Sequence, residues 1–319
     1  IALLSHTNPD GDTIGAALAW RSYLERLGHT TCCIAPNRYP YFLEWMTDIG
    51  HIGVFKEDHD GAMARFIGEA DVIFCMDFNQ INRLDRVTDT VTANTTAVRV
   101  LIDHHLHPPV DGYAVQFSDT HACSTSYIVY QLLEAMAGTD AIDQAMAESL
   151  YVGIMTDTGN FSFSSLTSDL FRAVAVLIDK GVNVPYVNSS VYNNFSEGRM
   201  RLLGYMLNDK MVTDYEFGVA YVSLTEEEMR RFDFIQGDSE GFVNYPLSIR
   251  GIRMSAMFIQ TKHSIRVSLR SRGEVDVNVF ARRYFDGGGH RNAAGGKSYV
   301  PMNETLENFR KYLREYFGA

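Results

Sequence analysis

Four separate parts of the chain carry acidic and imidazole side chains that are able to bind divalent cations. The first part is the segment HTNPDGD near the N-terminus, and the second is a single aspartate at the end of the run VIFCMD. The third is the triplet Asp-His-His at the end of RVLID, and the fourth is an aspartate in GIMTDTGN. The candidate residues are His6, Asp10, Asp12, Asp77, Asp103, His104, His105 and Asp157.

Five of these side chains are aspartates, and five carboxylates cannot gather in one crevice without compensation, because like charges repel and burial of each is costly. Divalent cations would remove this conflict. Carboxylate and imidazole ligands without thiolate suit Mn²⁺, Mg²⁺, Fe²⁺ or Co²⁺ better than a structural zinc. The ligands suffice for two ions about 3.5–4 Å apart that share one carboxylate. Such a pair lowers the pKa of a bound water and promotes its attack on phosphorus, so the pattern predicts a phosphoester hydrolase.

Each motif alone also has an ordinary structural explanation. Asp10 and Asp12 fit a turn and a helix cap, His6 fits a hydrogen-bonded histidine, and Asp77 fits a strand end. The adjacent histidines 104 and 105 are harder to explain, because they follow a buried strand. The order of the motifs, each at the end of an apolar element, favours one shared site.

The elements that must position these residues alternate along the first half of the chain. Short apolar runs predict buried strands over 1–5, 30–35, 71–77 and 97–103. Helical spacing is present over 12–28, 123–137, 140–156 and 167–181. Strands that alternate with helices predict an α/β fold with a mostly parallel, doubly wound sheet. In such a sheet, ligands bind outside the carboxyl ends of the strands, where three of the four motifs lie.

The second half of the chain predicts a smaller α/β domain, with a cleft between it and the first domain. Strands are expected over 216–224, 252–261 and 264–271. Helices are expected over 225–232, 275–285 and from residue 303, and Thr225 with Glu228 could form a capping box. We therefore expect a catalytic domain over 1–183, a helical linker over 184–212 without a strand, and a substrate-binding domain over 213–319.

Composition and charge restrict the choice of function. The net charge is −11, which disfavours a stable complex with long nucleic acid or an anionic membrane. Residues 247–300 nevertheless hold ten Lys and Arg against three Asp and Glu, so this segment is either a confined site for a small anion or a solvated charged face. No apolar run is long enough to span a membrane, no signal peptide is visible, and the four cysteines form no CxxC pair. We expect a cytoplasmic protein.

The motifs resemble those of the DHH phosphoesterase superfamily. HTNPDGDTIG, Asp77, the triplet 103–105 and the segment around Asp157 are similar to its four motifs, and GGGHRNAAG at 287–295 is similar to the signature of the DHH-associated domain. The resemblance covers nearly the whole chain. Within the superfamily, it is greatest to the nanoRNases, which are oligoribonucleases and 3′-phosphoadenosine 5′-phosphate phosphatases.

This resemblance implies a role for each residue. His6, Asp10 and Asp77 would bind one ion, and Asp12, Asp77, His104 and Asp157 the other, with Mn²⁺ the usual ion. Asp77 would bridge, His105 would face the scissile phosphate as acid or electrostatic stabiliser, and Asp103 would orient a neighbouring histidine. Residues of the second domain would hold a non-scissile phosphate or terminal nucleotide. These are Arg270, Gly287, Gly288, Gly289 and His290. The glycines would let the backbone approach an anion, although such a run is also typical of a flexible turn.

Several aromatic residues could form a surface that binds nucleobases. Phe78 follows the bridging aspartate, where a smaller residue is expected, so its ring could narrow the site or face a base. Phe161, Phe163, Tyr186 and Tyr192 could stack on bases, although packing in the core or linker explains them better.

The expected activity is hydrolysis of di- to pentanucleotides to nucleoside 5′-monophosphates, and of 3′-phosphoadenosine 5′-phosphate to AMP. The nearest alternative is a hydrolase of cyclic or linear dinucleotides such as cyclic di-AMP, pApA or pGpG. An inorganic pyrophosphatase and a RecJ-like exonuclease share the metal centre but differ in the second domain or in length. A nucleotide sensor without activity would be expected to lack metal ligands. A homodimer is a further expectation.

Overall fold

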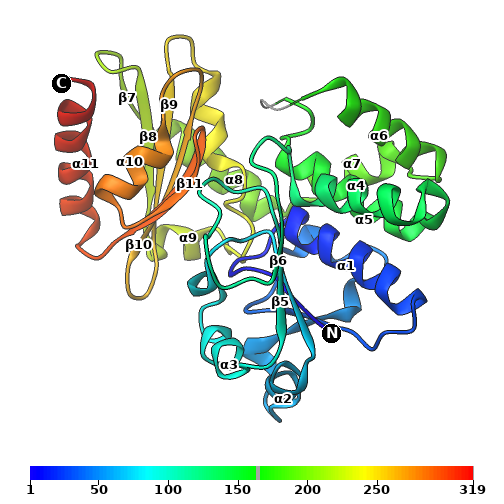
Figure 1. Ribbon diagram of the computed structural model, residues 1–319. Coiled ribbons are helices and arrows are strands. Elements are labelled where there is room, and N and C mark those ends of the chain that lie inside the picture. The colour runs from blue at the N-terminus through cyan, green and yellow to red at the C-terminus, as the bar shows by residue number, and fades with distance from the viewer. Residues whose placement is uncertain (163–165, 319) are drawn as a thin grey trace. The chain divides into compact units, whose positions relative to one another are not determined.

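The computed structural model describes residues 1–162 and 166–318, which divide into two compact units, Ile1–Asn194 and Phe195–Ala319 (Figure 1). Helix α7 (Val184–Tyr192) belongs to the first unit, and helix α8 (Glu197–Tyr205) begins the second. The segment expected to be a linker is therefore divided between the two units, and a short strand begins at its end, at Val212. Among the described helices, none has the length and apolar character required to cross a lipid bilayer.

The first unit contains a six-stranded sheet in which every pairing is parallel. The strands are β1 (Ala2–Leu4), β2 (Cys32–Ala35), β3 (Ile52–Val54), β4 (Val72–Met76), β5 (Val98–Asp103) and β6 (Val115–Ser118), in the order β3-β2-β1-β4-β5-β6. The four strands predicted from apolar runs are confirmed. The two strands that the sequence did not reveal, β3 and β6, lie at the edges, and β6 is mostly exposed, so neither has a long apolar run.

Helices cover both faces of this sheet, as expected for a doubly wound fold (Figure 1). They are α1 (Gly11–Arg26), α2 (Ala62–Glu69), α3 (Val87–Ala93), α4 (Thr125–Ala137), α5 (Gln144–Asp157) and α6 (Ser168–Asp179). Alternate strand residues point to opposite faces: Leu3 packs in the cluster of α1, α4 and α5, whereas Leu4 packs in that of α2 and α3. Short 3₁₀ helices lie in the connections, at Tyr41–Leu43, Ile49–His51, Phe55–Glu57, Ile81–Leu84 (η4) and Thr139–Ala141.

The strand order places a topological switch point between β1 and β4. From β1 the chain runs outward to β2 and β3, and it then returns to β4 and runs the other way to β5 and β6. The segments that follow two neighbouring strands therefore diverge above the sheet, and this is where ligands bind in such folds. His6, Asp10 and Asp12 follow β1, and Asp77 follows β4.

The second unit contains a mixed sheet in the order β11-β12-β10-β9-β8-β7, in which only β8 and β9 pair in parallel. Its strands are β7 (Val212–Asp214), β8 (Val219–Leu224), β9 (Met254–Gln260), β10 (Ile265–Ser271), β11 (Gly288–His290) and β12 (Ala293–Ser298). Its further helices are the π-helix Met206–Lys210, α9 (Glu226–Arg231), the 3₁₀ helix Phe242–Ser248, α10 (Val277–Tyr284) and α11 (Met302–Phe317). The capping box of Thr225 and Glu228 is present at the start of α9.

The glycine-rich segment is part of this sheet and is not a flexible turn. Gly288, Gly289 and His290 form β11, which pairs antiparallel with β12. A Cβ atom on Gly287 would lie 2.0 Å from the carbonyl oxygen of Gly295, and one on Gly289 would lie 2.6 Å from that of Ala293. The glycines therefore allow the two strand backbones to approach closely. Because glycine has no side chain, the sequence shows no alternation that would indicate a strand here.

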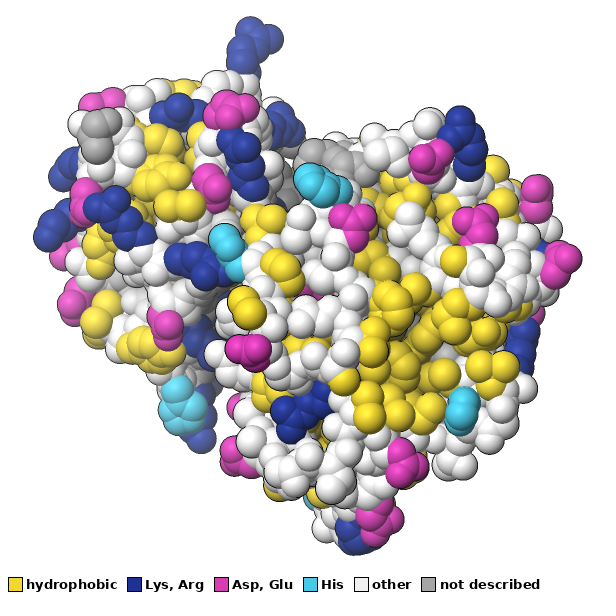
Figure 2. Space-filling model, viewed as in Figure 1, with side chains coloured by type: hydrophobic (Ala, Val, Ile, Leu, Met, Phe, Trp, Pro, Cys, Tyr) yellow, Lys and Arg dark blue, Asp and Glu magenta, His cyan; other side chains and the backbone are white. Residues whose placement is uncertain are grey.

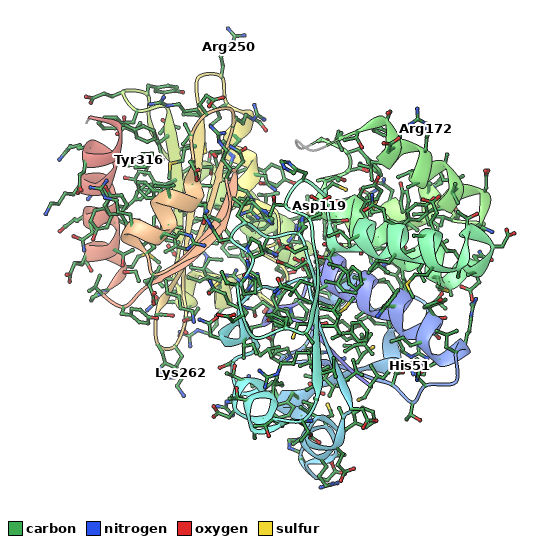
Figure 3. The ribbon with its side chains drawn as sticks, in the orientation of Figure 1. His51, Asp119, Arg172, Arg250, Lys262 and Tyr316 are labelled. Atoms are coloured by element: carbon green, nitrogen blue, oxygen red, sulfur yellow. The ribbon has the colours of Figure 1, made fainter. Side chains whose placement is uncertain are left out.

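The positive charge of residues 247–300 is spread over the second unit. Arg250 and Lys262 project from opposite ends of the unit (Figure 3), and basic and acidic side chains alternate on the face shown in Figure 2. Arg291 pairs with Glu274, and Arg283 pairs with Glu315, which lies outside the segment. The distribution favours a solvated charged face for most of these residues.

Candidate metal centre

The loop between β1 and α1 presents two of the predicted ligands. Asp10 is the N-cap of α1, and its Oδ1 accepts hydrogen bonds from the backbone N–H groups of Asp12 and Thr13 at 3.1 and 3.2 Å. Its Oδ2 lies 3.9 Å from Nε2 of His6. The Nδ1 of His6 lies 2.9 Å from the carbonyl oxygen of Thr7, which can only accept, so Nδ1 carries the proton. The Nε2 lone pair of His6 is thereby directed toward the carboxylates, as in a metal-binding histidine.

Asp77 lies between the two halves of the cluster. Its Oδ2 is 3.4 Å from Nε2 of His6, and its Oδ1 is 3.5 Å from Nε2 of His104 and 3.7 Å from Nδ1 of His105. The backbone of Asp77 has a φ of +66°, in the left-handed region, and its N–H donates to the carbonyl oxygen of Ile102. Asparagine and aspartate tolerate this region better than other non-glycine residues, and such strained positions cluster at functional sites. Oδ2 of Asp77 therefore faces His6, and Oδ1 faces His104 and His105.

Asp12 is buried against the N-terminus of α4. Its Oδ2 accepts from the backbone N–H of Thr125 at 2.7 Å, and its Oδ1 accepts from that of Ser126 at 2.8 Å. These N–H groups have no partner within their own helix, and the helix dipole favours negative charge at this end. The hydroxyl of Thr125 donates to Oδ1 of Asp77 at 2.9 Å. The first turn of α4 therefore holds two of the predicted ligands.

His104 follows β5 directly, and its two ring nitrogens face different partners. Nδ1 of His104 donates to the carbonyl oxygen of Ala122 at 3.2 Å, so its Nε2 faces the carboxylates of Asp12, Asp77 and Asp157 at 3.9, 3.5 and 3.3 Å. Ala122 is held in a turn that begins at Asp119, labelled in Figure 3, whose N–H bonds to the carbonyl oxygen of the last residue of β5.

The fully buried Asp103 holds His105. Its Oδ2 accepts the backbone N–H of His105 at 3.1 Å, and its Oδ1 lies 2.7 Å from Nδ1 of the His105 ring. One carboxylate therefore fixes both the backbone and the ring of the same residue. The orienting role of Asp103 stays a prediction, which this contact supports.

The cluster is open on one side. The side chains of His6, Asp12, Asp77 and His104 are at most 5% exposed, whereas those of Asp10 and Asp157 are 49% and 30% exposed. Asp157 ends α5, and the side chain of His105 is 15% exposed. A ligand would enter past the three exposed side chains.

The charged side chains of the cluster shift one another's pKa. Burial, together with repulsion from Asp77 and Asp157, raises the pKa of Asp12 well above its usual range. Burial opposes the charged form of His104, but the three facing carboxylates outweigh it and raise the pKa of His104 well above its usual range. Burial also opposes the charged form of Asp77, but His104 and His6 hold its pKa well below its usual range. Without cations, the cluster is therefore stabilised by protons that divalent ions would displace.

The donor set fits divalent cations. Two groups of side chains each offer ligand atoms within 4.8 Å of one another: His6, Asp10 and Asp77 form one group, and Asp12, His104 and Asp157 form the other. Both groups contain carboxylate oxygen and imidazole nitrogen without thiolate, and both histidines present a lone pair fixed by a carbonyl oxygen behind the ring. The six residues predicted as metal ligands thus lie together in the first unit.

The residues predicted to contact substrate in the second unit lie on two strands. Arg270 is on β10, where its Nη1 donates to the carbonyl oxygen of Leu269 at 3.0 Å. Gly288, Gly289 and His290 form β11, and Gly287 precedes it. Their role in binding an anion stays a prediction.

Most of the aromatic candidates are part of the hydrophobic core. Phe78 is fully buried in the cluster that packs on α2 and α3, so its ring cannot face a base. Phe161 and Tyr192 pack against the other cluster, and Tyr186 is half exposed with its ring edge on Trp45. Phe163 lies outside the described residues.

Sequence reasoning missed several residues that support the cluster. Thr125 and Ser126 belong to the segment Ser124-Thr125-Ser126, a recognisable start signal for a helix. The signal predicts where α4 begins, but not that its first N–H groups face Asp12. Arg83, in η4, lies against His105 and carried no motif that could have identified it.

Comparison with known proteins identifies the family. The N-terminal domain of the DHH family matches residues 1–154, and the DHHA1 domain matches residues 215–319. The crystal structure of an exopolyphosphatase-related protein from Bacteroides fragilis is 38% identical, covers 99% of this chain and 92% of its own, and superposes with a TM-score of 0.91. The chain belongs to the DHH phosphoesterase family.

Curated members of the DHH family include relatives of known activity. The "Bifunctional oligoribonuclease and PAP phosphatase NrnA" of Bacillus subtilis is 28% identical over 304 residues, which cover 94% of this chain and 89% of the relative. The "Cyclic-di-AMP phosphodiesterase GdpP" of the same organism is 26% identical over 99% of this chain, but the match covers only 48% of that relative. The match to the N-terminal domain of the DHH family, over residues 1–154, includes every predicted metal ligand except Asp157.

Proposed function

We propose that the protein is a two-metal phosphodiesterase that hydrolyses short oligonucleotides to nucleoside 5′-monophosphates and 3′-phosphoadenosine 5′-phosphate to AMP. The observation that carries the proposal is Asp77, whose two carboxylate oxygens face two separate groups of potential ligands. The similarity to the bifunctional relative of Bacillus subtilis over nearly its whole length supports this choice of substrate.

His6, Asp10 and Asp77 would hold one ion, and Asp12, His104, Asp157 and again Asp77 would hold the other. We propose Mn²⁺, because the hardness of these ligands suits it and the family resemblance favours it, although Mg²⁺, Co²⁺ and Fe²⁺ suit the same ligands. When bound, such ions would activate water and offset charge on the phosphoryl oxygens.

The chain's own residues would orient the substrate. His105 would face the scissile phosphate as an acid or electrostatic stabiliser, and Asp103 would keep its ring in place through the contact at 2.7 Å. Asp12 and Asp77 would keep their orientation through Thr125, which contacts both. Because these side chains are already held in place, they lose little conformational entropy when substrate binds.

The second unit would bind the part of the substrate that is not cleaved. We propose that Arg270, Gly287, Gly288, Gly289 and His290 hold a non-scissile phosphate or terminal nucleotide. Backbone N–H groups and an arginine suit such an anion. The catalytic part would be residues 1–183, and the substrate-binding part residues 213–319. The net charge of −11 supports small substrates over long strands. Four cysteines without disulfides support a reducing compartment, for which we propose the cytoplasm.

The direct test is incubation of the purified protein with Mn²⁺ and a 5′-labelled series from dinucleotide to pentanucleotide, with a 24-mer as comparison. We expect release of mononucleotides from the short substrates and little from the long one. The absence of any mononucleotide from protein with full metal occupancy would contradict the proposal.

A second candidate function is hydrolysis of dinucleotides that come from cyclic signals. The 26% identity to the cyclic-di-AMP phosphodiesterase favours it, although the match covers about half of that relative. A panel of pApA, pGpG, cyclic di-AMP, a pentanucleotide and 3′-phosphoadenosine 5′-phosphate, compared by kcat/KM, separates the two functions. Values of kcat/KM for pApA, pGpG and cyclic di-AMP well above those for a pentanucleotide and for 3′-phosphoadenosine 5′-phosphate would favour the second.

A further inference from the structure

One arginine lies at the edge of the candidate metal centre. Arg83 is in η4, between β4 and α3, and its Nη1 lies 3.2 Å from Nε2 of His105. An arginine has only donors, so Nε2 of this ring accepts, and the ring proton is on Nδ1, which faces Asp103 at 2.7 Å. The ring of His105 therefore lies between the guanidinium of Arg83 and Asp77, whose Oδ1 is 3.7 Å from Nδ1 of His105.

The position of Arg83 is fixed by its backbone. Its carbonyl oxygen accepts from the N–H of Thr7 at 2.8 Å, and its own N–H donates to the carbonyl oxygen of Gln80 at 3.0 Å. The next residue, Leu84, is fully buried beside Phe78. The loop that carries His6 and the turn that carries Arg83 are thus joined directly, and the guanidinium extends from a rigid base.

The charge of Arg83 is not neutralised by the protein. Within residues 1–162 and 166–318, no carboxylate forms an ion pair with it, although five aspartates lie in the adjoining cluster, and its side chain makes a hydrogen bond only to His105. A guanidinium carries five N–H donors in a planar fork that matches two oxygens of a phosphate. Four of these donors are not used within the described parts of the chain, and the side chain is only partly buried, so solvent or a ligand reaches them.

We propose that Arg83 is a catalytic residue that binds the non-bridging oxygens of the scissile phosphoryl group, beside His105. This proposal rests on the proposed function. It adds to the first unit a positively charged side chain that recognises the reacting phosphoryl group. Its charge would stabilise the additional negative charge that develops on these oxygens during the displacement. No bond to Arg83 forms or breaks, and it transfers no proton.

The test compares Arg83→Gln and Arg83→Lys with Arg86→Gln, which removes an exposed charge three residues further on. With pApA and Mn²⁺, we expect Arg83→Gln to lower kcat about 100-fold or more, which is the effect of losing one preorganised donor to a developing oxyanion. Arg83→Lys should recover part of this loss, and Arg86→Gln should match the wild type. Metal content should be unchanged in all three, because Arg83 is not a ligand. Guanidinium ion added to Arg83→Ala should restore part of kcat.

A second measurement does not depend on turnover. Calorimetric titration of the Mn²⁺-loaded proteins with inorganic phosphate should show affinity at least tenfold lower in Arg83→Gln than in the wild type and in Arg86→Gln. Wild-type kcat and phosphate affinity in Arg83→Gln, or a loss of bound metal parallel to the loss of activity, would overturn the proposal. If the wild type hydrolyses no nucleotide yet binds phosphate through Arg83, the proposed function fails and the anion contact stands. Failure of wild-type protein to bind phosphate would overturn the contact itself.

Discussion

The backbone N–H of Thr125 donates to Oδ2 of Asp12 over 2.7 Å, between residues 113 positions apart in the chain. The hydroxyl of the same threonine donates to Asp77 at 2.9 Å. The start of α4 is therefore part of the cluster, although it contributes no predicted ligand. Removing either donor would leave a buried carboxylate oxygen with one partner fewer, which is costly in the absence of metal.

The substitution Thr125→Val keeps the shape of the side chain and the N–H to Asp12, but removes the hydroxyl bond to Asp77. We expect metal affinity to fall about 10- to 100-fold, as is typical when an outer contact of a ligand is lost. Titration of the metal-free protein with Mn²⁺ measures this change. Thr125→Ser, which keeps the hydroxyl, is the control, and equal affinities in the two variants would show that the bond has no such role.

The substitution Asp77→Asn tests the shared ligand. Asparagine also tolerates a φ of +66°, so the fold should be preserved, while one oxygen ligand is replaced by an NH₂ group that cannot bind a cation. We expect binding of both ions to weaken and kcat to fall at least about 100-fold, because in the proposed site both ions would share this carboxylate. Elemental analysis after dialysis, with kcat on a dinucleotide, measures both effects. Asp71→Asn, an exposed change before the same strand, should behave as the wild type.

Neighbouring glycines of the β11 segment should respond differently to an added methyl group. In Gly287→Ala the Cβ would lie 2.0 Å from a backbone oxygen, so part of the hairpin must move. We expect this to lower the free energy of unfolding by about 1–3 kcal/mol, the usual cost of overpacking. In Gly288→Ala the nearest atom would be 3.5 Å away, an ordinary contact. Thermal unfolding of the two variants measures the difference, and equal melting temperatures would contradict the close approach.

Glu228 should make the stability of the second unit depend on pH. Burial opposes its charge, but Lys210, the N–H of Thr225 and the hydroxyl of Tyr205 outweigh it and lower its pKa from 4.5 to about 2. A lowered pKa in the folded state stabilises the protein above the unfolded pKa, and this contribution is lost as the pH falls from 4.5 toward 2. Glu228→Gln should therefore lower the melting temperature at pH 7 and have less effect near pH 3. The exposed Glu227→Gln is the control. A deficit that is the same at both pH values would argue against a charge effect.

The central strands and the cluster could be predicted because each depends on local signals. Apolar runs mark β1, β2, β4 and β5, and the polar residues that follow them must meet, because parallel strands end at one edge of the sheet. The edge strands β3 and β6 could not be predicted, since β3 is only three residues long with a glycine at its centre, and β6 is mostly exposed and carries no run of apolar side chains. The hairpin of β11 and β12 was hidden because glycine has no side chain whose periodicity could indicate a strand.

The residues that support the cluster could not be predicted from the sequence for a different reason. Thr125 and Arg83 act through contacts between segments that are distant in the sequence, and neither has a local pattern that indicates its partner. Phe78 is a case in which reasoning from sequence position was wrong. Its place next to Asp77 suggested a ring in the site, whereas the ring is fully buried in the cluster that packs on α2 and α3.

The left-handed backbone of Asp77 also limits how this centre can change. Most side chains are disfavoured there, and glutamate, the other natural carboxylate, would carry both the conformational cost and an extra methylene that moves its oxygens. Aspartate, asparagine and glycine tolerate this backbone conformation at low cost, and of these only aspartate has the two carboxylate oxygens that the proposed bridge between ions requires. If Asp77 bridges two ions as proposed, we expect new specificity to arise from the surrounding residues, while Asp77 itself is retained.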